Sequence, residues 1–260
     1  MFFTQRAIEE DIADWVEDRF ATLLEHFSST HPVHETELIL PNDARFNVTE
    51  TDAEARARTL FEATVASAGF CEQTFDLVAL EDDTPPTTIA AHMQITAGNS
   101  DRTIWGVSDV QSYKISFAKD LIGYPVNLVA TYARELARKL VKDKDFKAAI
   151  DSEDAELVVD LCTVYLGFGV FKANAAFEIE RSAGDLLGRW SSRQQGYLTE
   201  NSLTYATALF CTIKDDGFEE ARNALKPRLQ GVFDRAMKQI GRRGDQWGLF
   251  ELDRSAKPEA

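Results

Sequence analysis

A run of almost entirely apolar residues constrains the fold of this chain more than any other feature. Between Leu157 and Phe171 the only charged residue is Asp160. A helix that is apolar on nearly all sides is buried in a protein core or in a membrane, and this run is shorter than the ~20 residues that a membrane span needs. The sequence therefore predicts a buried helix that begins near residues 151–154 and ends at Gly167 or Gly169.

Two carboxylates share one face of this predicted helix. Glu156 and Asp160 are four residues apart, so they lie one turn apart on the same side. Burying both without partners would cost several kcal/mol, and cations must therefore face them. The nearest candidates in the sequence are Arg134 and Arg138, on a helix expected from Pro125 to about residue 141.

Residues 134–138 read Arg-Glu-Leu-Ala-Arg. With His at positions 134 and 138 this would be the HExxH zinc helix of a metallopeptidase. Together with the Glu-x-x-x-Asp pattern of residues 156–160, the segment resembles the gluzincin arrangement of zincin-like enzymes. Residues 127–174 and the Gly-Tyr-Leu at 196–198 also resemble bacterial proteins of uncharacterised function that carry an intact Ala-His-Glu-Leu-Ala-His. In that arrangement the Glu matching Glu156 is the third metal ligand, and the Asp matching Asp160 supports a ligand histidine.

The two arginines change the chemistry that the resemblance implies. A zinc ligand must offer a lone pair, and an arginine side chain stays protonated and offers none. We therefore expect no metal and no cofactor, and Glu135 would be a vestigial general base. Two guanidiniums facing Glu135 and Glu156 sum to zero charge, as one Zn²⁺ would. The sequence predicts an arginine–carboxylate network in which Asp160 adds one negative charge, shared through a bidentate contact with Arg138.

The resemblance implies a catalytically inactive, metallopeptidase-like pseudoenzyme that acts by binding a protein or peptide partner. One alternative is a hydrolase with a repurposed metal-free site, in which Glu135 and Glu156 do acid–base work and an arginine stabilises an anionic transition state. Another is a sensor that holds a small anionic ligand between Arg134 and Arg138. In the plainest alternative the helix is solvated, Glu135 and Arg138 form an ordinary surface ion pair, and the resemblance is accidental.

Charge and cysteine content limit the partners and the compartment. The net charge of −15 argues against nucleic acid, whose phosphates need clustered Lys and Arg, and against anionic membrane surfaces. The three cysteines form no CxxC or disulfide pattern, and the N-terminus reaches acidic residues before any apolar run of signal-peptide length. These features predict a cytoplasmic protein, and they leave its oligomeric state open.

Hydrophobic periodicity predicts an α+β fold. An N-terminal helix-and-sheet region, residues 1–120, would hold helices and a small mixed or antiparallel sheet. A mostly helical zincin-like region, residues 121–260, would follow, either as a second domain after a boundary near 118–124 or as part of one continuous domain. Expected helices cover residues 5–27, 52–68, 200–213 (capped by Thr199) and 216–240, and expected strands cover residues 36–40, 75–80, 87–96, 104–107 and 112–117.

Other residues carry weaker patterns. His31-x-x-His34 encloses a proline and is expected in a surface loop. Cys71 is the most plausible reactive thiol, whereas a cysteine inside the apolar run would belong to the core. Tyr197 and Tyr205 are expected either to line a former cleft or, more simply, to pack.

Overall fold

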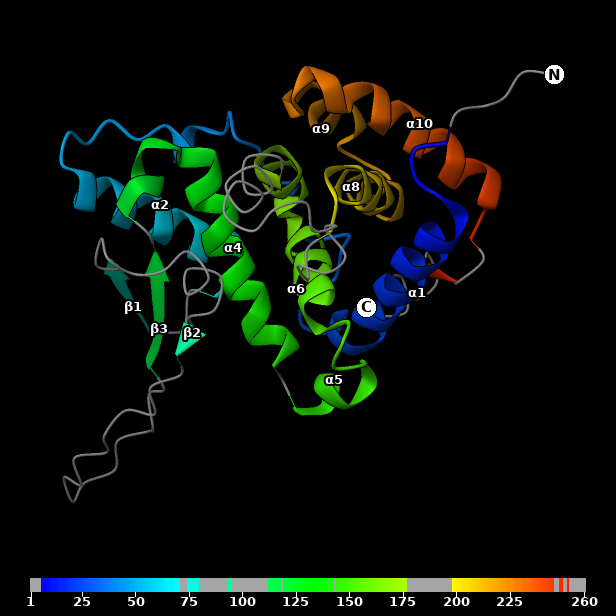
Figure 1. Ribbon diagram of the computed structural model, residues 1–260, viewed down its shortest axis with the longest axis horizontal. Coiled ribbons are helices and arrows are strands. Elements are labelled where there is room, and N and C mark those ends of the chain that lie inside the picture. The colour runs from blue at the N-terminus through cyan, green and yellow to red at the C-terminus, as the bar shows by residue number, and fades with distance from the viewer. Residues whose placement is uncertain are drawn as a thin grey trace, which may run out of the picture.

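The computed structural model describes residues 6–70, 74–79, 93–94, 112–117, 119–142, 144–176, 198–245, 248–249 and 252. Most of these residues are helical (Figure 1), which confirms the helical character expected from the sequence. The α-helices are α1 (Glu10–Phe27), α2 (Ala53–Ser67), α4 (Pro125–Val141), α5 (Lys144–Ala149), α6 (Ala155–Thr163), α8 (Glu200–Lys214), α9 (Phe218–Ala224) and α10 (Pro227–Arg243). None of the described helices is both long enough and apolar enough to cross a membrane.

A small three-stranded sheet lies beside these helices. Strand β3 (Ser112–Phe117) is central, pairing in parallel with β1 (Thr74–Ala79) and antiparallel with β2 (Met93–Gln94). Two expected strands coincide with β1 and β3, β2 falls within the expected 87–96 segment, and the expected strand at 104–107 lies outside the described residues. Because the strands have only 6, 2 and 6 residues beside long helices, the α+β class itself stays a prediction.

Helix α4 holds the centre of the molecule. It packs against α2 and β3 on one side and against α6 on another, and α6 in turn contacts α1 and α8. Figure 1 shows this order, with α4 between the sheet and α6 and with α10 lying over α8. Buried apolar side chains from residues 1–120 and from residues 121–260 belong to one hydrophobic cluster. Helices α4 and α6, which carry the predicted site residues, are therefore neighbours inside the core.

Several expected elements differ from those in the structure. Residues 37–40 form no strand; instead, the backbone N–H of Ile39 donates to the carbonyl of Gly167 at 3.0 Å. The expected helix 216–240 is two helices, α9 and α10, because Pro227 has no N–H to continue a helix and suits a first turn. Helix α5 was not expected, and α1 begins at Glu10.

The expected end of the apolar helix is also wrong. The chain passes through a π-helical segment, Val164–Phe168, and stays helical through residues 169–176. Gly167 has φ +88°, and a Cβ there would lie 2.1 Å from the carbonyl oxygen of Glu37. The glycine therefore permits a close backbone approach within the helical run and does not end it.

Candidate functional site

Helices α4 and α6 bring all five predicted site residues together. Arg134, Glu135 and Arg138 project from α4, and Glu156 and Asp160 project from α6. Both arginines are buried, at 5% and 6% exposure, and Asp160 is fully buried. The solvated-helix alternative is therefore wrong. Glu156 alone reaches solvent, with its side chain 47% exposed.

The two arginines meet at Glu156. Arg134 donates from Nη2 to Oε2 of Glu156 at 2.8 Å, and Arg138 donates from Nη1 to its Oε1. Arg138 also donates from Nε to Oε2 of Glu135 at 3.1 Å. The arginine–carboxylate network predicted from the sequence is thus present, and each oxygen of Glu156 accepts from a different arginine.

The predicted contact between Arg138 and Asp160 is wrong. Arg134 makes it instead, donating from Nε to Oδ1 of Asp160 at 2.6 Å. The reason is helix direction: with Arg134 opposite Asp160 and Arg138 opposite Glu156, α4 and α6 run antiparallel at this point. The residue nearer the start of α4 therefore faces the residue further along α6.

Lys172 is a member of the network that the sequence analysis missed. Its Nζ lies 2.9 Å from Oδ1 of Asp160, and its side chain is 3% exposed. The backbone N–H of Leu198 donates to Oδ2 of the same carboxylate at 2.9 Å. Lys172 follows the apolar run directly. Because the helix was expected to end at Gly167 or Gly169, Lys172 was not considered as a partner of Asp160. With Lys172 included, three cations face three carboxylates and the cluster is neutral.

The electrostatics favour the ionised forms of Glu156 and Asp160. Burial alone would raise the pKa of Glu156, but the hydrogen bond from Arg138 and the charge of Arg134 outweigh it, and the pKa is lowered. Burial would likewise raise the pKa of Asp160, yet the charges of Lys172 and Arg134 bring it below its usual range. Burial lowers the pKa of Lys172, whereas Asp160 opposes that shift and favours the charged form. Because Asp160 accepts from three donors, we assign the ionised form to its carboxylate and the charged form to Lys172.

Four of the six guanidinium nitrogens of the site donate hydrogen bonds to carboxylates. Both Nε atoms and one terminal nitrogen of each arginine already donate to carboxylates, and Nη1 of Arg134 lies 4.0 Å from Oε1 of Glu135. Nη2 of Arg138 is buried without a hydrogen-bond partner among the residues that the structure describes. Glu135 is itself 5% exposed, so it is a bound partner of Arg138 and not an open base.

The weaker candidates fall elsewhere. His31 and His34 lie in the loop after α1, as expected, and Tyr205 packs in the core, where its hydroxyl donates to Glu17 of α1 at 2.5 Å. Cys71, Tyr197 and His92 lie outside the described residues. Within the described part of the chain, no group of three or more His, Cys, Asp or Glu side chains is placed to hold a metal ion.

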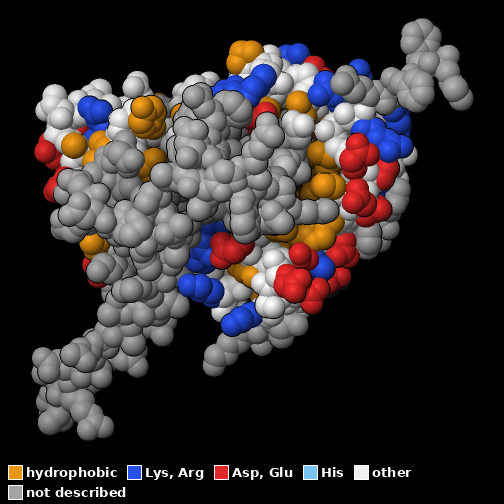
Figure 2. Space-filling view, viewed as in Figure 1, with side chains coloured by type: hydrophobic (Ala, Val, Ile, Leu, Met, Phe, Trp, Pro, Cys, Tyr) orange, Lys and Arg blue, Asp and Glu red, His pale blue; other side chains and the backbone are white. Residues whose placement is uncertain are grey.

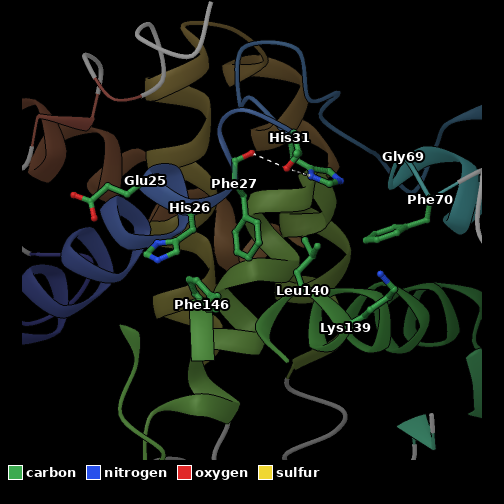
Figure 3. Close-up of a pocket in the computed structure, with 10 residues that line it drawn as sticks. Glu25, His26, Phe27, His31, Gly69, Phe70, Lys139, Leu140 and Phe146 are labelled. Atoms are coloured by element: carbon green, nitrogen blue, oxygen red, sulfur yellow. Dashed lines mark hydrogen bonds between the residues drawn. The ribbon is translucent and has the colours of Figure 1, made fainter. Parts of the chain in front are cut away.

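A separate pocket of about 530 Å³ lies at the C-terminal end of α4. Figure 3 shows Phe27, Leu140 and Phe146 around its middle, and His31 near Phe70 and Lys139 at its other end. Burial, with a smaller contribution from the charge of Lys139, lowers the pKa of His31. Residues of the arginine–carboxylate network do not line this pocket, so the two features are distinct.

A comparison of the chain with protein-family models, curated proteins and solved structures finds no match. The site is therefore defined by its own residues and geometry. Its defining feature is a neutral, buried cluster of Arg134, Arg138, Lys172 and three carboxylates, open to solvent only at Glu156.

Proposed function

We propose that this chain is a metallopeptidase-like pseudoenzyme that has lost its zinc site and acts by binding a protein or peptide partner. The observation that carries the proposal is the convergence of Arg134 and Arg138 on the two oxygens of Glu156. In the arrangement that the sequence resembles, the residues at these three positions would be the metal ligands. Asp160 also fits that arrangement, because it accepts a hydrogen bond from residue 134, the position of the histidine that it would support.

Charge supports the same proposal. Zn²⁺ carries the same charge as the two guanidiniums, and the remaining groups, Lys172 and the three carboxylates, sum to the opposite value. Exchanging one zinc ion for two arginines would therefore leave the buried cluster neutral. Neutrality matters here because an uncompensated buried charge is strongly destabilising.

The geometry favours binding over the hydrolase alternative. An acid–base mechanism needs a carboxylate with a raised pKa or one that can reach a substrate proton. The pKa of Glu156 and that of Asp160 are both lowered, and Glu135 is buried against Arg138. The anion-sensor alternative is also disfavoured, since both guanidiniums are already paired with carboxylates.

Two broader expectations belong to the same proposal. We propose a cytoplasmic location from the unpaired pattern of the cysteines, two of which, Cys162 and Cys211, are buried free thiols. We also retain the α+β class, with the helical region carrying the zincin-like helix pair α4 and α6. The mixed pairing of β3 with β1 and β2 is compatible with that class.

A peptide-library experiment separates binding from hydrolysis. The native protein is incubated with a mixture of unmodified peptides, and both retained and cleaved peptides are identified by mass spectrometry. We expect a subset of peptides to be retained intact, with no cleavage above a protein-free control. Cleavage that disappears in a Glu135→Gln variant would overturn the pseudoenzyme proposal in favour of the repurposed hydrolase. If no peptide is retained and none is cleaved, both the pseudoenzyme proposal and the hydrolase alternative are contradicted.

A further inference from the structure

Helix α10 carries a line of positively charged residues on its outer face. Gly231, Arg235, Lys238 and Arg242 are spaced by four, three and four residues, so they lie along one side of the helix; we call these four residues the α10 stripe. Lys238 and Arg242 are exposed and Arg235 is half-buried. The helix holds five basic residues and one acidic residue in a chain whose net charge is −15.

Other charged residues of α10 form ion pairs within the chain. Arg228 pairs with Glu200 at 2.9 Å, and Asp234 pairs with Arg222 of α9 at 2.7 Å. By contrast, Arg235, Lys238 and Arg242 form no ion pair within 4.0 Å of a described carboxylate, although Asp234, whose pKa is lowered chiefly by Arg222, also feels the charges of Lys238 and Arg235. The Nε of Arg235 is also buried without a hydrogen-bond partner among those residues. The three cations of the stripe are therefore available to an anionic partner.

Gly231 makes this face flat. Glycine inside a helix is unfavourable compared with alanine, and a buried close contact usually explains it. Here a Cβ at Gly231 would approach only the Nη1 of Arg235, at 3.6 Å, so packing within this chain does not require glycine. A position without a side chain lets a second backbone come close to the helix.

The last turn of α10 shows which anion suits such a surface. Arg243 accommodates three carboxylates from one helix face of α1, with contacts of 2.5 Å to Glu10, 2.5 Å to Asp14 and 2.8 Å to Glu17. These acids are spaced by four and three residues. Figure 2 shows the same division, with Lys and Arg side chains gathered over α10 and Asp and Glu side chains over α1.

We propose that the α10 stripe is a docking surface for an acidic helix of a partner protein, with carboxylates at i, i+4 and i+7. The inference rests on the proposed binding function and names the chemistry of the partner. A protein helix fits better than a nucleic acid or a membrane, because three cations are few for a dense array of phosphates.

Fluorescence anisotropy with a designed probe tests the inference. The probe is a labelled, end-capped alanine-rich peptide of about 20 residues, long enough to be helical, with glutamates at i, i+4, i+7 and i+11. A second peptide has the same composition with its glutamates spread around the helix. We expect the patterned peptide to bind the native chain more tightly than the scrambled one. Lys238→Glu/Arg242→Glu should weaken that binding by roughly tenfold or more.

Matched variants separate the stripe from overall charge. Arg58→Glu/Lys147→Glu makes the same charge change at two exposed residues on α2 and α5, and it should leave the patterned peptide's affinity unchanged. Gly231→Gln should raise the melting temperature yet weaken peptide binding, because it adds helix propensity and obstructs the face. A Gly231→Gln variant with raised melting temperature and unchanged affinity would contradict a close helix–helix approach.

Other occupants would overturn the assignment. Equal binding of both peptides, or an equal loss in Arg58→Glu/Lys147→Glu, would reduce the stripe to general electrostatics. Tighter binding of a short DNA duplex or of phosphatidylserine vesicles would replace the partner class, and self-association lost in Lys238→Glu/Arg242→Glu would make a second copy the occupant. These failures are distinguishable from failure of the proposed function, since peptide-library retention that survives Lys238→Glu/Arg242→Glu leaves the pseudoenzyme proposal standing.

Discussion

At the scale of single residues, the buried arginines define the site. Removing one of them leaves buried carboxylates without their counter-charge, so Arg138→Ala should lower the free energy of unfolding by about 3–5 kcal/mol. Arg222→Ala is the matched control, because Arg222 also pairs closely with a carboxylate but with side chains 42% exposed; solvent screens such a pair, so this variant should destabilise the fold far less. Equal losses in urea unfolding would contradict a buried network.

The lowered carboxylate pKa values predict acid sensitivity. A carboxyl group whose pKa is lower in the folded state stabilises the fold above its ordinary pKa, and this stabilisation is lost as the pH falls through the folded-state value. For Glu156 and Asp160 the ordinary values are 4.5 and 3.8, so the loss should begin below about pH 5. Urea unfolding at a series of pH values measures it. An Asp160→Asn variant with the same acid profile as the native chain would exclude Asp160 as a contributor.

At the scale of elements, the close approach at Gly167 can be tested by adding one methyl group. Gly167→Ala places a Cβ against the carbonyl of Glu37 at a residue with φ +88°. The backbone conformation alone should cost about 1–3 kcal/mol, with the clash adding to it. Gly231→Ala, inside α10 with ordinary contacts only, should instead stabilise by about 0.5–1 kcal/mol. Changes in melting temperature of the same sign in both variants would contradict these expectations.

Elements with local causes could be predicted from the sequence. The side chain of Thr199 accepts from the backbone of Ser202 and caps α8, as expected, and Pro125 begins α4. The role of Gly167 inside the helical run could not be predicted, because it depends on a close approach to the backbone of Glu37, far away in the chain. Because the helix was expected to end there, Lys172 was missed. Five of the six network residues were identified because their spacing and their missing counter-charges are visible in the sequence.

At the scale of the whole molecule, the N-terminal and C-terminal helices are held together by a second charged cluster. Arg243 of α10 binds Glu10, Asp14 and Glu17 of α1, and Tyr205 of α8 donates to Glu17 at 2.5 Å. Figure 1 shows α1 and α10 on the same side of the molecule. The arginine side chain is 9% exposed and that of Glu17 is 3% exposed, so this cluster closes the fold between distant segments.

Removing the guanidinium of Arg243 from this cluster should destabilise the folded chain. Arg243→Ala leaves the buried Glu17 without its guanidinium and should cost about 3 kcal/mol or more. The neighbouring Arg242 is exposed and has no ion pair with a described residue, so Arg242→Ala should change stability by less than about 0.5 kcal/mol. Thermal unfolding of both variants measures the difference. Similar melting temperatures would place Arg243 outside the stabilising interactions.

In the proposed pseudoenzyme, two arginines replace a metal ion between helices α4 and α6. Elemental mass spectrometry of untagged native protein, beside an Arg134→His/Arg138→His double variant, tests this proposal most directly. We expect no zinc in the native chain and about one zinc per chain in the variant, held by the two introduced imidazoles and Glu156. A variant that folds but binds no zinc, or stoichiometric zinc in the native chain, would contradict the proposal.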